Sequence, residues 1–354
     1  MSHPLVSICV PTRNRAAVLA GNLENICGQD YSNLEILISD NCSSDDTERV
    51  CRAAAASDAR IRYVRHAQNI GLHGNHNFCM DEARGDFLCF FHDHDRHDAR
   101  LVATYVDFMH RYPRVGLVGS DWDLVDDEGR QLGIREFQGP PLTAGVDYAS
   151  RTIRSGRSSI GIPCAMIRRE ALGTTRFGIH APIGFGDFPI WFRIAETWDI
   201  GHVHARLSSW RQNADSLSLR PIVEITRDYQ KNIGEYCDDY LRRRPDSGAQ
   251  VEAWRASLRR FVFCALAYEV ALHFRRRDAS GGYATGGTLF EIMNYRLTAE
   301  QFDRALAEMD QLRSGFFENA VFLIVRLLMG LRLTSPFGWA VRHQAAFRAL
   351  LGLK

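Results

Sequence analysis

The chain has 354 residues, 45% of them hydrophobic, and a formal net charge of +1 at pH 7. This length exceeds what one hydrophobic core usually organises, so we expect two lobes or one domain with an appendage. A net charge near zero argues against a nucleic-acid partner, because such proteins usually carry a strong basic excess. The 9 cysteines form no Cys-x-x-Cys pair, and the first residues lack the apolar core of a signal peptide. Both features favour a cytoplasmic protein with reduced thiols.

Strand and helix patterns alternate through the first half of the chain. Apolar β-rich runs occur at 6–10, 34–39, 61–64 and 87–92, and helical patterns at 16–27, 43–52 and 77–83. Strand, crossover helix and strand in this order predict an α/β fold, with a mostly parallel sheet and helices on both of its faces.

Polar side chains follow these strands, at the point where each strand ends. They are Thr12, Arg13, Asn14, Asp40, Asn41, Asp93 and Asp95. The carboxyl ends of parallel strands meet at one edge of a sheet, which is where ligands bind in open α/β folds. A carboxylate such as Asp40 can accept a hydrogen bond from a base, and one such as Asp93 from ribose hydroxyls. The alternative for Asp40 is a turn or a helix cap.

The last of these strand ends is acidic and reads His92-Asp93-His94-Asp95. Two carboxylates that are one residue apart repel each other unless a positive charge lies between them, and a divalent cation commonly supplies it. A cation at Asp95 would in turn bind the oxygens of a diphosphate. The turn therefore points to phosphate-ester chemistry.

Several motifs follow one another in a fixed order over roughly the first 125 residues. They are Val-Pro-Thr-Arg-Asn at 10–14, Ser-Asp-Asn-Cys-Ser-Ser-Asp-Asp-Thr at 39–47, Asn69-Ile70-Gly71 with Gly74-Asn75, and Ala-Arg-Gly-Asp at 83–86. Together with the acidic turn they resemble the family 2 glycosyltransferases. The resemblance implies the Rossmann-like GT-A fold, with a mixed, mostly parallel sheet flanked by helices. It also implies a nucleotide-sugar donor and a DXD-type motif that binds Mn²⁺ or Mg²⁺.

The resemblance also implies roles for single residues. Asp40 would contact the nucleobase, Asp93 the ribose or the metal, and Asp95 the metal. His94 stands where the family often has an acid, and an imidazole ligand moves the preference toward Mn²⁺ and away from Mg²⁺. The metal set is thus Asp95, Asp93 and His94. The nucleotide-binding set is Pro11, Thr12, Arg13, Asn14, Asp40, Asn69, Asp93 and Arg211.

Two later segments continue the resemblance. In similar transferases a Glu-Asp pair opens a helix and its Asp is the general base; here Asp187 matches the Asp, and Gly186 replaces the Glu. A helix N-terminus would hold such a carboxylate ionised, although a simple N-cap uses the same geometry. Arg211 matches the arginine of an aromatic-Arg-x-His segment that closes over the diphosphate, and Asn213 replaces the His. A guanidinium suits the charge of the leaving group.

Four acids follow the apolar run at 115–120, namely Asp121, Asp123, Asp126 and Asp127. Because Asp127-Glu128-Gly129 is a good turn sequence, we interpret all four as part of a solvated hairpin in preference to a metal site.

The pattern changes to helices beyond about residue 220. We therefore predict a GT-A domain at 1–220, with a nucleotide-binding half at 1–110 and an acceptor half at 111–220, and a helical region at 221–354. Residues 319–354 carry five basic residues and no acidic one. This segment predicts either an amphipathic anchor on an anionic membrane surface or a helix packed against the catalytic lobe or a dimer partner.

The function that these features favour is an inverting, metal-dependent glycosyltransferase. The donor would be a UDP- or dTDP-sugar and the acceptor a saccharide or a lipid-linked sugar, in polysaccharide or glycolipid synthesis at the inner face of the cell membrane. One alternative is a metallo-hydrolase that uses His92, His94 and His97, although Arg96 stands where its motif needs an acid. Another is a non-catalytic subunit that binds nucleotide sugars.

Overall fold

The computed structural model describes residues 3–178, 185–212, 222–278 and 311. The chain divides into two compact units. One comprises Met1–Ser150 and Ser158–Ala214, and the other Arg151–Arg157 and Asp215–Lys354. The predicted division at residue 220 stays a prediction, because it falls among residues 213–221, which lie outside the described part.

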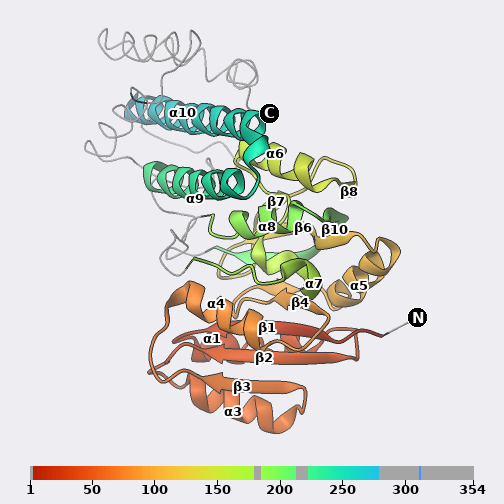
Figure 1. Ribbon diagram of the computed structural model, residues 1–354. Coiled ribbons are helices and arrows are strands. Elements are labelled where there is room, and N and C mark those ends of the chain that lie inside the picture. The colour runs from red at the N-terminus through yellow and green to blue at the C-terminus, as the bar shows by residue number, and fades with distance from the viewer. Residues whose placement is uncertain (1–2, 179–184, 213–221, 279–310, 312–354) are drawn as a thin grey trace. The chain divides into compact units, whose positions relative to one another are not determined.

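A ten-stranded mixed sheet forms the centre of the first unit (Figure 1), in the order β3-β2-β1-β4-β9-β6-β10-β5, with β7 beside β6 and β8 beside β10. The strands are β1 Val6–Thr12, β2 Leu34–Asp40, β3 Ile61–Arg65, β4 Phe87–Phe90, β5 Arg96–His97, β6 Val115–Val125, β7 Gln131–Arg135, β8 Leu142–Thr143, β9 Ala165–Arg168 and β10 Asp199–Arg211. β1 to β4 run parallel, as do β6 and β10, while β9 is antiparallel to both β4 and β6. The predicted mixed, mostly parallel sheet is confirmed.

Helices cover both faces of this sheet. They are α1 Ala16–Ala20, α2 Leu23–Cys27, α3 Thr47–Ser57, α4 Gly71–Glu82, α5 Leu101–Arg111, α7 Arg169–Leu172 and α8 Phe188–Ala195, with a 3-10 turn at Ile162–Cys164. Helix α6, Gly145–Ser155, follows β8 and ends in residues of the second unit. Successive side chains of a strand point to opposite faces, and β1 shows the result. Ile8 packs in the core beneath α1, α2, α3 and α5, whereas the Cys9 thiol donates to the carbonyl of Cys79 in α4.

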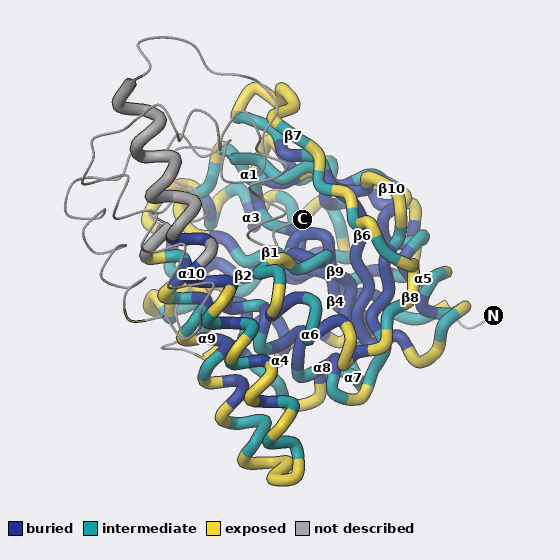
Figure 2. Tube along the Cα trace, turned by 90° about the horizontal axis from the view of Figure 1, so that it is seen from above, coloured by how far each residue is buried: buried dark blue, intermediate teal, exposed yellow. Residues whose placement is uncertain are grey.

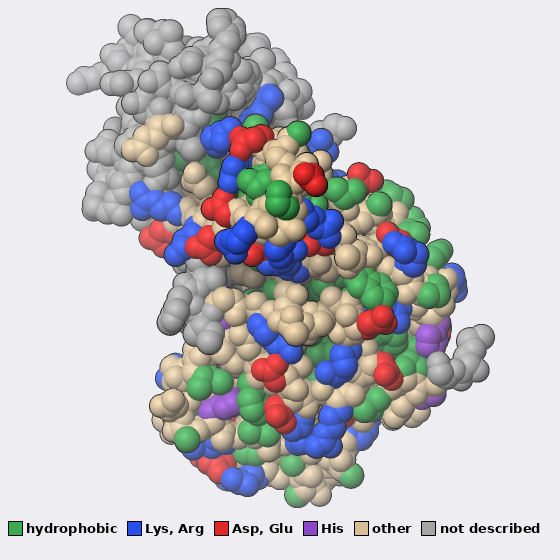
Figure 3. Space-filling view, viewed as in Figure 1, with side chains coloured by type: hydrophobic (Ala, Val, Ile, Leu, Met, Phe, Trp, Pro, Cys, Tyr) green, Lys and Arg blue, Asp and Glu red, His purple; other side chains and the backbone are tan. Residues whose placement is uncertain are grey.

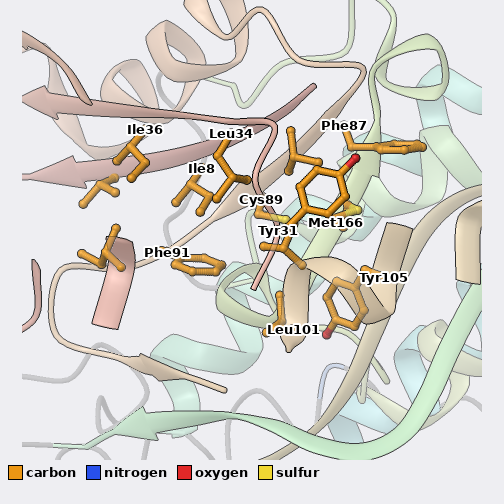
Figure 4. Packing of buried hydrophobic residues seen from close by; sticks show 14 of the residues in the cluster. Ile8, Tyr31, Leu34, Ile36, Phe87, Cys89, Phe91, Leu101, Tyr105 and Met166 are labelled. Carbon is orange, nitrogen blue, oxygen red and sulfur yellow. The ribbon is translucent and has the colours of Figure 1, made fainter. Parts of the chain in front are cut away.

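The core on the α5 side joins strands that are far apart in sequence (Figure 4). Ile8, Ile36, Cys89 and Met166 come from four different strands and meet Tyr105 of α5. The central strands β4 and β9 are accordingly buried almost throughout (Figure 2). This rigid, dry sheet fixes the positions of the loops that follow its strands.

The surface carries charges of both signs. On the face shown in Figure 3, acidic and basic side chains lie interspersed, in keeping with the net charge of +1. Many are paired within a helix, such as Arg52 with Glu48 at 2.7 Å. Exposed pairs of this kind contribute little to stability.

The second unit contains two long helices, α9 Ile222–Arg243 and α10 Gly248–Asp278. Aromatic rings join them, with Trp254 of α10 lying 5.0 Å from Tyr240 between ring centroids. Among the described residues, no helix is both long and apolar enough to cross a bilayer. The basic segment predicted at 319–354 lies outside the described residues.

Candidate active site

The strand ends that were expected to converge do lie together. Thr12 and Asp40 are opposite each other at the ends of β1 and β2. Asp93 follows β4, and its Oδ2 accepts a hydrogen bond of 2.7 Å from the Thr12 hydroxyl. One edge of the parallel sheet therefore carries side chains from three strands, at the place where α/β folds bind ligands.

The acidic turn after β4 is held by hydrogen bonds on both carboxylates. Asp93 Oδ1 lies 2.9 Å from Nδ1 of His94. Asp95 Oδ1 accepts the main-chain N–H of Arg211 at 2.8 Å, and its Oδ2 lies 3.4 Å from Nδ1 of His92. Both carboxylates are buried, Asp95 with only 2% exposure. Two carboxylates are thus kept out of water, with imidazoles as their nearest basic groups.

Asn22 supports this turn, and sequence reasoning missed it. Its side-chain amide donates to the carbonyls of Asp95 at 2.7 Å and of Asp93 at 3.3 Å. The single helix expected at 16–27 is split into α1 and α2, and Asn22 lies in the turn between them. The adjacent Gly21-Asn22 pair was the available signal, because both residues weaken a helix interior.

Three donors of the turn are grouped as a metal site would require. Ligand atoms of His92, His94 and Asp95 lie within 4.8 Å of one another. The predicted metal set of Asp95, Asp93 and His94 stays a prediction. His92 lies in this group as well, and the oxygens of Asp93 contact Thr12 and His94. Two imidazoles and one carboxylate are ligands that Mn²⁺ and other first-row divalent ions accept. The residues present therefore fit a metal.

Within the turn, the histidines favour the ionised form of Asp95, and the acids favour the charged form of His94. Burial by itself would raise the pKa of Asp95, but the hydrogen bond and charge of His92 and the charge of His94 outweigh it and lower that pKa. Burial also opposes the charging of His94, yet Asp93 and Asp95 raise the pKa of its imidazole. Asp95 therefore stays ionised and draws a positive charge to this place.

His97 does not join the cluster. Its ring stacks on Phe91 with centroids 3.7 Å apart, and burial lowers its pKa to about 3. The hydrolase alternative needs His97 together with His92 and His94, so it loses one of its three ligands.

Asp40 lies fully buried at the end of β2 and is well supplied with donors. Its Oδ1 accepts the backbone N–H of Ser43 at 2.9 Å, and its Oδ2 accepts the Tyr63 hydroxyl at 2.8 Å. Arg65 Nε lies 3.9 Å from Oδ2. The carboxylate thus organises the loop after β2, and its predicted contact with a nucleobase stays a prediction.

The other predicted nucleotide-binding residues surround Asp40. Asn14 adopts a positive φ of 51°, which asparagine tolerates, and its backbone N–H donates to the Ser43 hydroxyl. Asn69 Oδ1 accepts the side-chain amide of Asn41 at 2.8 Å. Pro11 is half-buried within β1, and Arg13 is exposed in the loop that follows this strand.

Asp187 immediately precedes α8, as predicted, but its side chain makes no capping hydrogen bond. Its Oδ2 accepts the indole N–H of Trp191 at 3.1 Å. Burial raises the pKa of Asp187 to about 6, against the opposing effects of Trp191 and of the nearby His92. His92 of the acidic turn thus acts electrostatically on Asp187 as well. A carboxyl group with such a pKa can take up a proton near neutral pH.

Arg211 ends β10 beside the acidic turn. Its main-chain N–H is bound to Asp95, and its side-chain Nε is buried without a hydrogen-bond partner among the described residues. A buried guanidinium N–H without an acceptor is costly, so an anionic ligand at this position would be favourable. Asn213 lies outside the described residues.

Comparisons with known proteins agree with this arrangement. The family model described as "Glycosyl transferase family 2" matches residues 7–175. Protein MT1568 of Mycobacterium tuberculosis is 39% identical over 238 residues, which cover 62% of this chain and 70% of that protein. The chain belongs to glycosyl transferase family 2.

Within this family, the GalNAc(5)-diNAcBac-PP-undecaprenol beta-1,3-glucosyltransferase of Campylobacter jejuni is 42% identical over 177 residues, or 49% of this chain. The chain spans 55% of that relative's length and 23% of protein y4gI of Sinorhizobium fredii.

Solved structures show the same fold. S. aureus TarS in complex with UDP-GlcNAc has a TM-score of 0.57 at 15% identity, covering 87% of this chain and 81% of that one. The mannosyltransferase PcManGT from Pyrobaculum calidifontis, in complex with GDP-Man and Mn²⁺, has a TM-score of 0.52 at 17% identity. This match covers 99% of this chain and 86% of that one. The GT-A fold that the family resemblance implied is confirmed.

Proposed function

We propose that this family 2 member is an inverting, metal-dependent glycosyltransferase, which moves a sugar from a nucleotide diphosphate to a hydroxyl group of its acceptor. One observation carries the proposal. His92, His94 and Asp95 have ligand atoms within 4.8 Å of one another, as a cation site for a diphosphate requires, and the charge of His92 also acts on the buried carboxyl of Asp187. Transfer of a sugar from a diphosphate requires both an anion-binding group and a base.

Asp95, His94 and His92 would hold the metal, with Asp93 as a supporting carboxylate through His94. When bound, a divalent ion supplies positive charge against the diphosphate oxygens. Imidazole ligands favour Mn²⁺ over Mg²⁺. The Mn²⁺ in the PcManGT complex is in keeping with this preference.

Asp187 is the proposed base. As the acceptor hydroxyl attacks the anomeric carbon, its proton passes to Oδ of Asp187, and the bond to the diphosphate oxygen breaks. Direct displacement by a single nucleophile inverts the anomeric centre. Near neutral pH a carboxyl with a pKa of about 6 is mostly ionised yet basic enough to accept this proton.

Arg211 would stabilise the diphosphate that leaves. Its buried Nε lacks a partner among the described residues, and its main chain is fixed on Asp95. An arginine held in this way can donate to a phosphate oxygen without first losing another bond.

The donor and acceptor classes are proposals as well. We propose a UDP- or dTDP-sugar donor whose nucleobase meets Asp40, and a saccharide or lipid-linked acceptor. The Campylobacter relative, whose name contains PP-undecaprenol, supports a lipid-linked acceptor at the inner face of the membrane. The chain would meet it as a peripheral protein, alone or as a homodimer.

A thermal-shift panel tests the proposal. The purified chain is heated with UDP, dTDP, GDP or CMP, each with and without Mn²⁺. We expect one diphosphate to raise the melting temperature only when Mn²⁺ is present, and the matching nucleotide sugar to be consumed with an acceptor. No response to any nucleotide, together with a stabilisation by zinc that His92→Ala/His94→Ala abolishes, would overturn the transferase in favour of a hydrolase. Nucleotide binding without transfer to any acceptor would indicate a non-catalytic subunit.

A further inference from the structure

A second group of side chains that can ligate a metal lies on β6 and β10, away from the acidic turn. It consists of Asp121, His202 and His204, whose ligand atoms lie within 4.8 Å of one another. The predicted hairpin forms between β6 and β7, but Asp121 is buried in it and is not solvated as expected. β6 continues to Val125, so Asp121 lies inside the strand with 6% exposure, and the turn forms only around Asp126 to Arg130.

The backbone brings the three residues together. β6 and β10 are parallel neighbours, with Gly119 opposite His202, and the register is irregular between Val203 and Arg206. The backbone N–H of His202 donates to the carbonyl of Pro141, so the segment before β8 covers this part of β10. Asp121 also accepts the backbone N–H of Phe137 at 2.9 Å. The carboxylate is thus enclosed by strands and by the chain that crosses them.

Asp121 lacks a charged partner in this enclosure. Its carboxylate is bound by the N–H of Phe137 and by Nε2 of His202 at 2.8 Å, and no Lys or Arg of the described residues forms an ion pair with it. A buried carboxylate without a cation is costly.

The contacts that His202 can make depend on which of its ring nitrogens carries the proton. If Nε2 carries the proton and donates to Asp121, then Nδ1 is a buried acceptor without a hydrogen-bond partner among the described residues. If Nδ1 carries the proton, then Nε2 and the carboxylate oxygen face each other with lone pairs at 2.8 Å. The side chain is only 3% exposed, so water does not resolve the conflict easily. A cation bound between Nε2 and the carboxylate would remove this repulsion of lone pairs, with the proton then on Nδ1.

His204 completes the group from the surface side. Its ring centroid lies 5.1 Å from that of His202, and the residue is exposed, so its side chain can turn toward the ion. Ligand atoms that share one ion at about 2.1 Å lie about 3 to 4 Å apart, which a small rotation would achieve. We propose that Asp121, His202 and His204 bind a divalent transition metal, with Zn²⁺ the ion best suited to two imidazoles, one carboxylate and a water.

This site is separate from the acidic turn. His204 and Arg211 are both on β10, and the rise of a strand places them roughly 20 Å apart. A metal here would tie β10 to β6. It would thereby stabilise the strand that presents the N–H of Arg211 to Asp95.

The test measures bound zinc in the full-length chain after dialysis against Zn²⁺, together with the rise in melting temperature that zinc produces. His204→Ala is the main variant, because an exposed side chain can be removed without disturbing the core. His110→Ala on α5 is the matched control. His92→Ala/His94→Ala removes the ligands of the acidic turn. We expect His204→Ala to bind one zinc fewer than the unaltered chain, with most of the zinc-dependent stabilisation lost.

The double variant of the turn should keep that stabilisation, and His110→Ala should behave like the unaltered chain. The proposal is overturned if His204→Ala binds as much zinc and gains as much stability as the unaltered chain. It is equally overturned if zinc binds only through the acidic turn, so that the double variant binds none. Co²⁺, whose visible absorption reports nitrogen ligands, gives a second readout on the same variants.

Discussion

The main-chain N–H of Arg211 donates to Oδ1 of Asp95 over 2.8 Å, across 116 positions of sequence. This bond joins the end of β10 to the acidic turn after β4. It holds the proposed metal ligand next to the proposed diphosphate-binding arginine. Because the donor is a main-chain N–H, a substitution of the Arg211 side chain does not remove this bond. Arg211→Ala should therefore leave metal affinity nearly intact while it weakens donor turnover.

We expect Asp95→Asn to abolish metal-dependent function. The substitution replaces a buried anion between two imidazoles by a neutral amide, so the cation loses its only charged ligand in the cluster. Transfer should fall by about 10²-fold or more, and the Mn²⁺-dependent thermal shift should disappear. Asp127→Asn, on the exposed β6–β7 turn, is the matched control. A variant at Asp95 that still binds Mn²⁺ normally would contradict the assignment.

The pH dependence of transfer should report Asp187. Its pKa is raised to about 6 from an ordinary value near 4, so below about pH 6 the carboxyl is protonated and cannot accept a proton. Activity should therefore rise with pH through an acid limb near 6. Asp187→Asn should lower turnover by about 10²- to 10⁴-fold. An acid limb near 4 would show that another group is the base.

Trp191→Phe should move that limb. The Trp191 indole donates to Oδ2 of Asp187 at 3.1 Å and favours the ionised form. Without it the pKa of Asp187 rises further, so the acid limb of kcat/KM should shift by about one unit to higher pH. Trp254→Phe, another buried tryptophan but in the second unit, serves as the control and should leave the limb in place.

Sequence reasoning found the parts of the site that follow from strand order. Thr12, Asp40, Asp93 and Asp95 each come directly after an apolar run, and parallel strands bring such ends together without further information. Asn22 was missed because its role depends on two carbonyls more than 70 positions away, which no local pattern encodes. 

The end of the strand at His92 and the exposure of Asp121 were predicted incorrectly, again because they depend on parts of the chain that are distant in sequence. His92 was counted as the last residue of a strand, but β4 ends at Phe90, so the imidazole is free to turn toward Asp95. Asp121 was assigned to a hairpin because a strong turn signal follows at 127–129. The hairpin does form between β6 and β7, but β10 pairs with the other edge of β6 and buries Asp121, and local turn propensity does not contain that information.

Asn22→Ala tests the support beneath the acidic turn. The change leaves the carbonyls of Asp93 and Asp95 without their buried donor and should cost about 1 to 3 kcal/mol of unfolding free energy. Asn25→Ala removes a similar bond to the carbonyl of His97, so it is matched for stability. Only Asn22→Ala should also weaken Mn²⁺ affinity, by about 10-fold. Equal affinities in the two variants would limit Asn22 to a role in folding.

The interleaved histidines should set the choice of metal. His94→Asp replaces an imidazole by a carboxylate and makes the turn resemble an unbroken run of acids. Hard oxygen ligands suit Mg²⁺, whereas imidazole favours Mn²⁺, so the ratio of Mg²⁺- to Mn²⁺-supported transfer should rise by about 10-fold. His110→Asp on α5 adds the same charge elsewhere and should leave the ratio unchanged. If the ratio also stays constant in His94→Asp while activity is retained, then His94 shapes the turn without touching the ion, and His92 and Asp95 bind it.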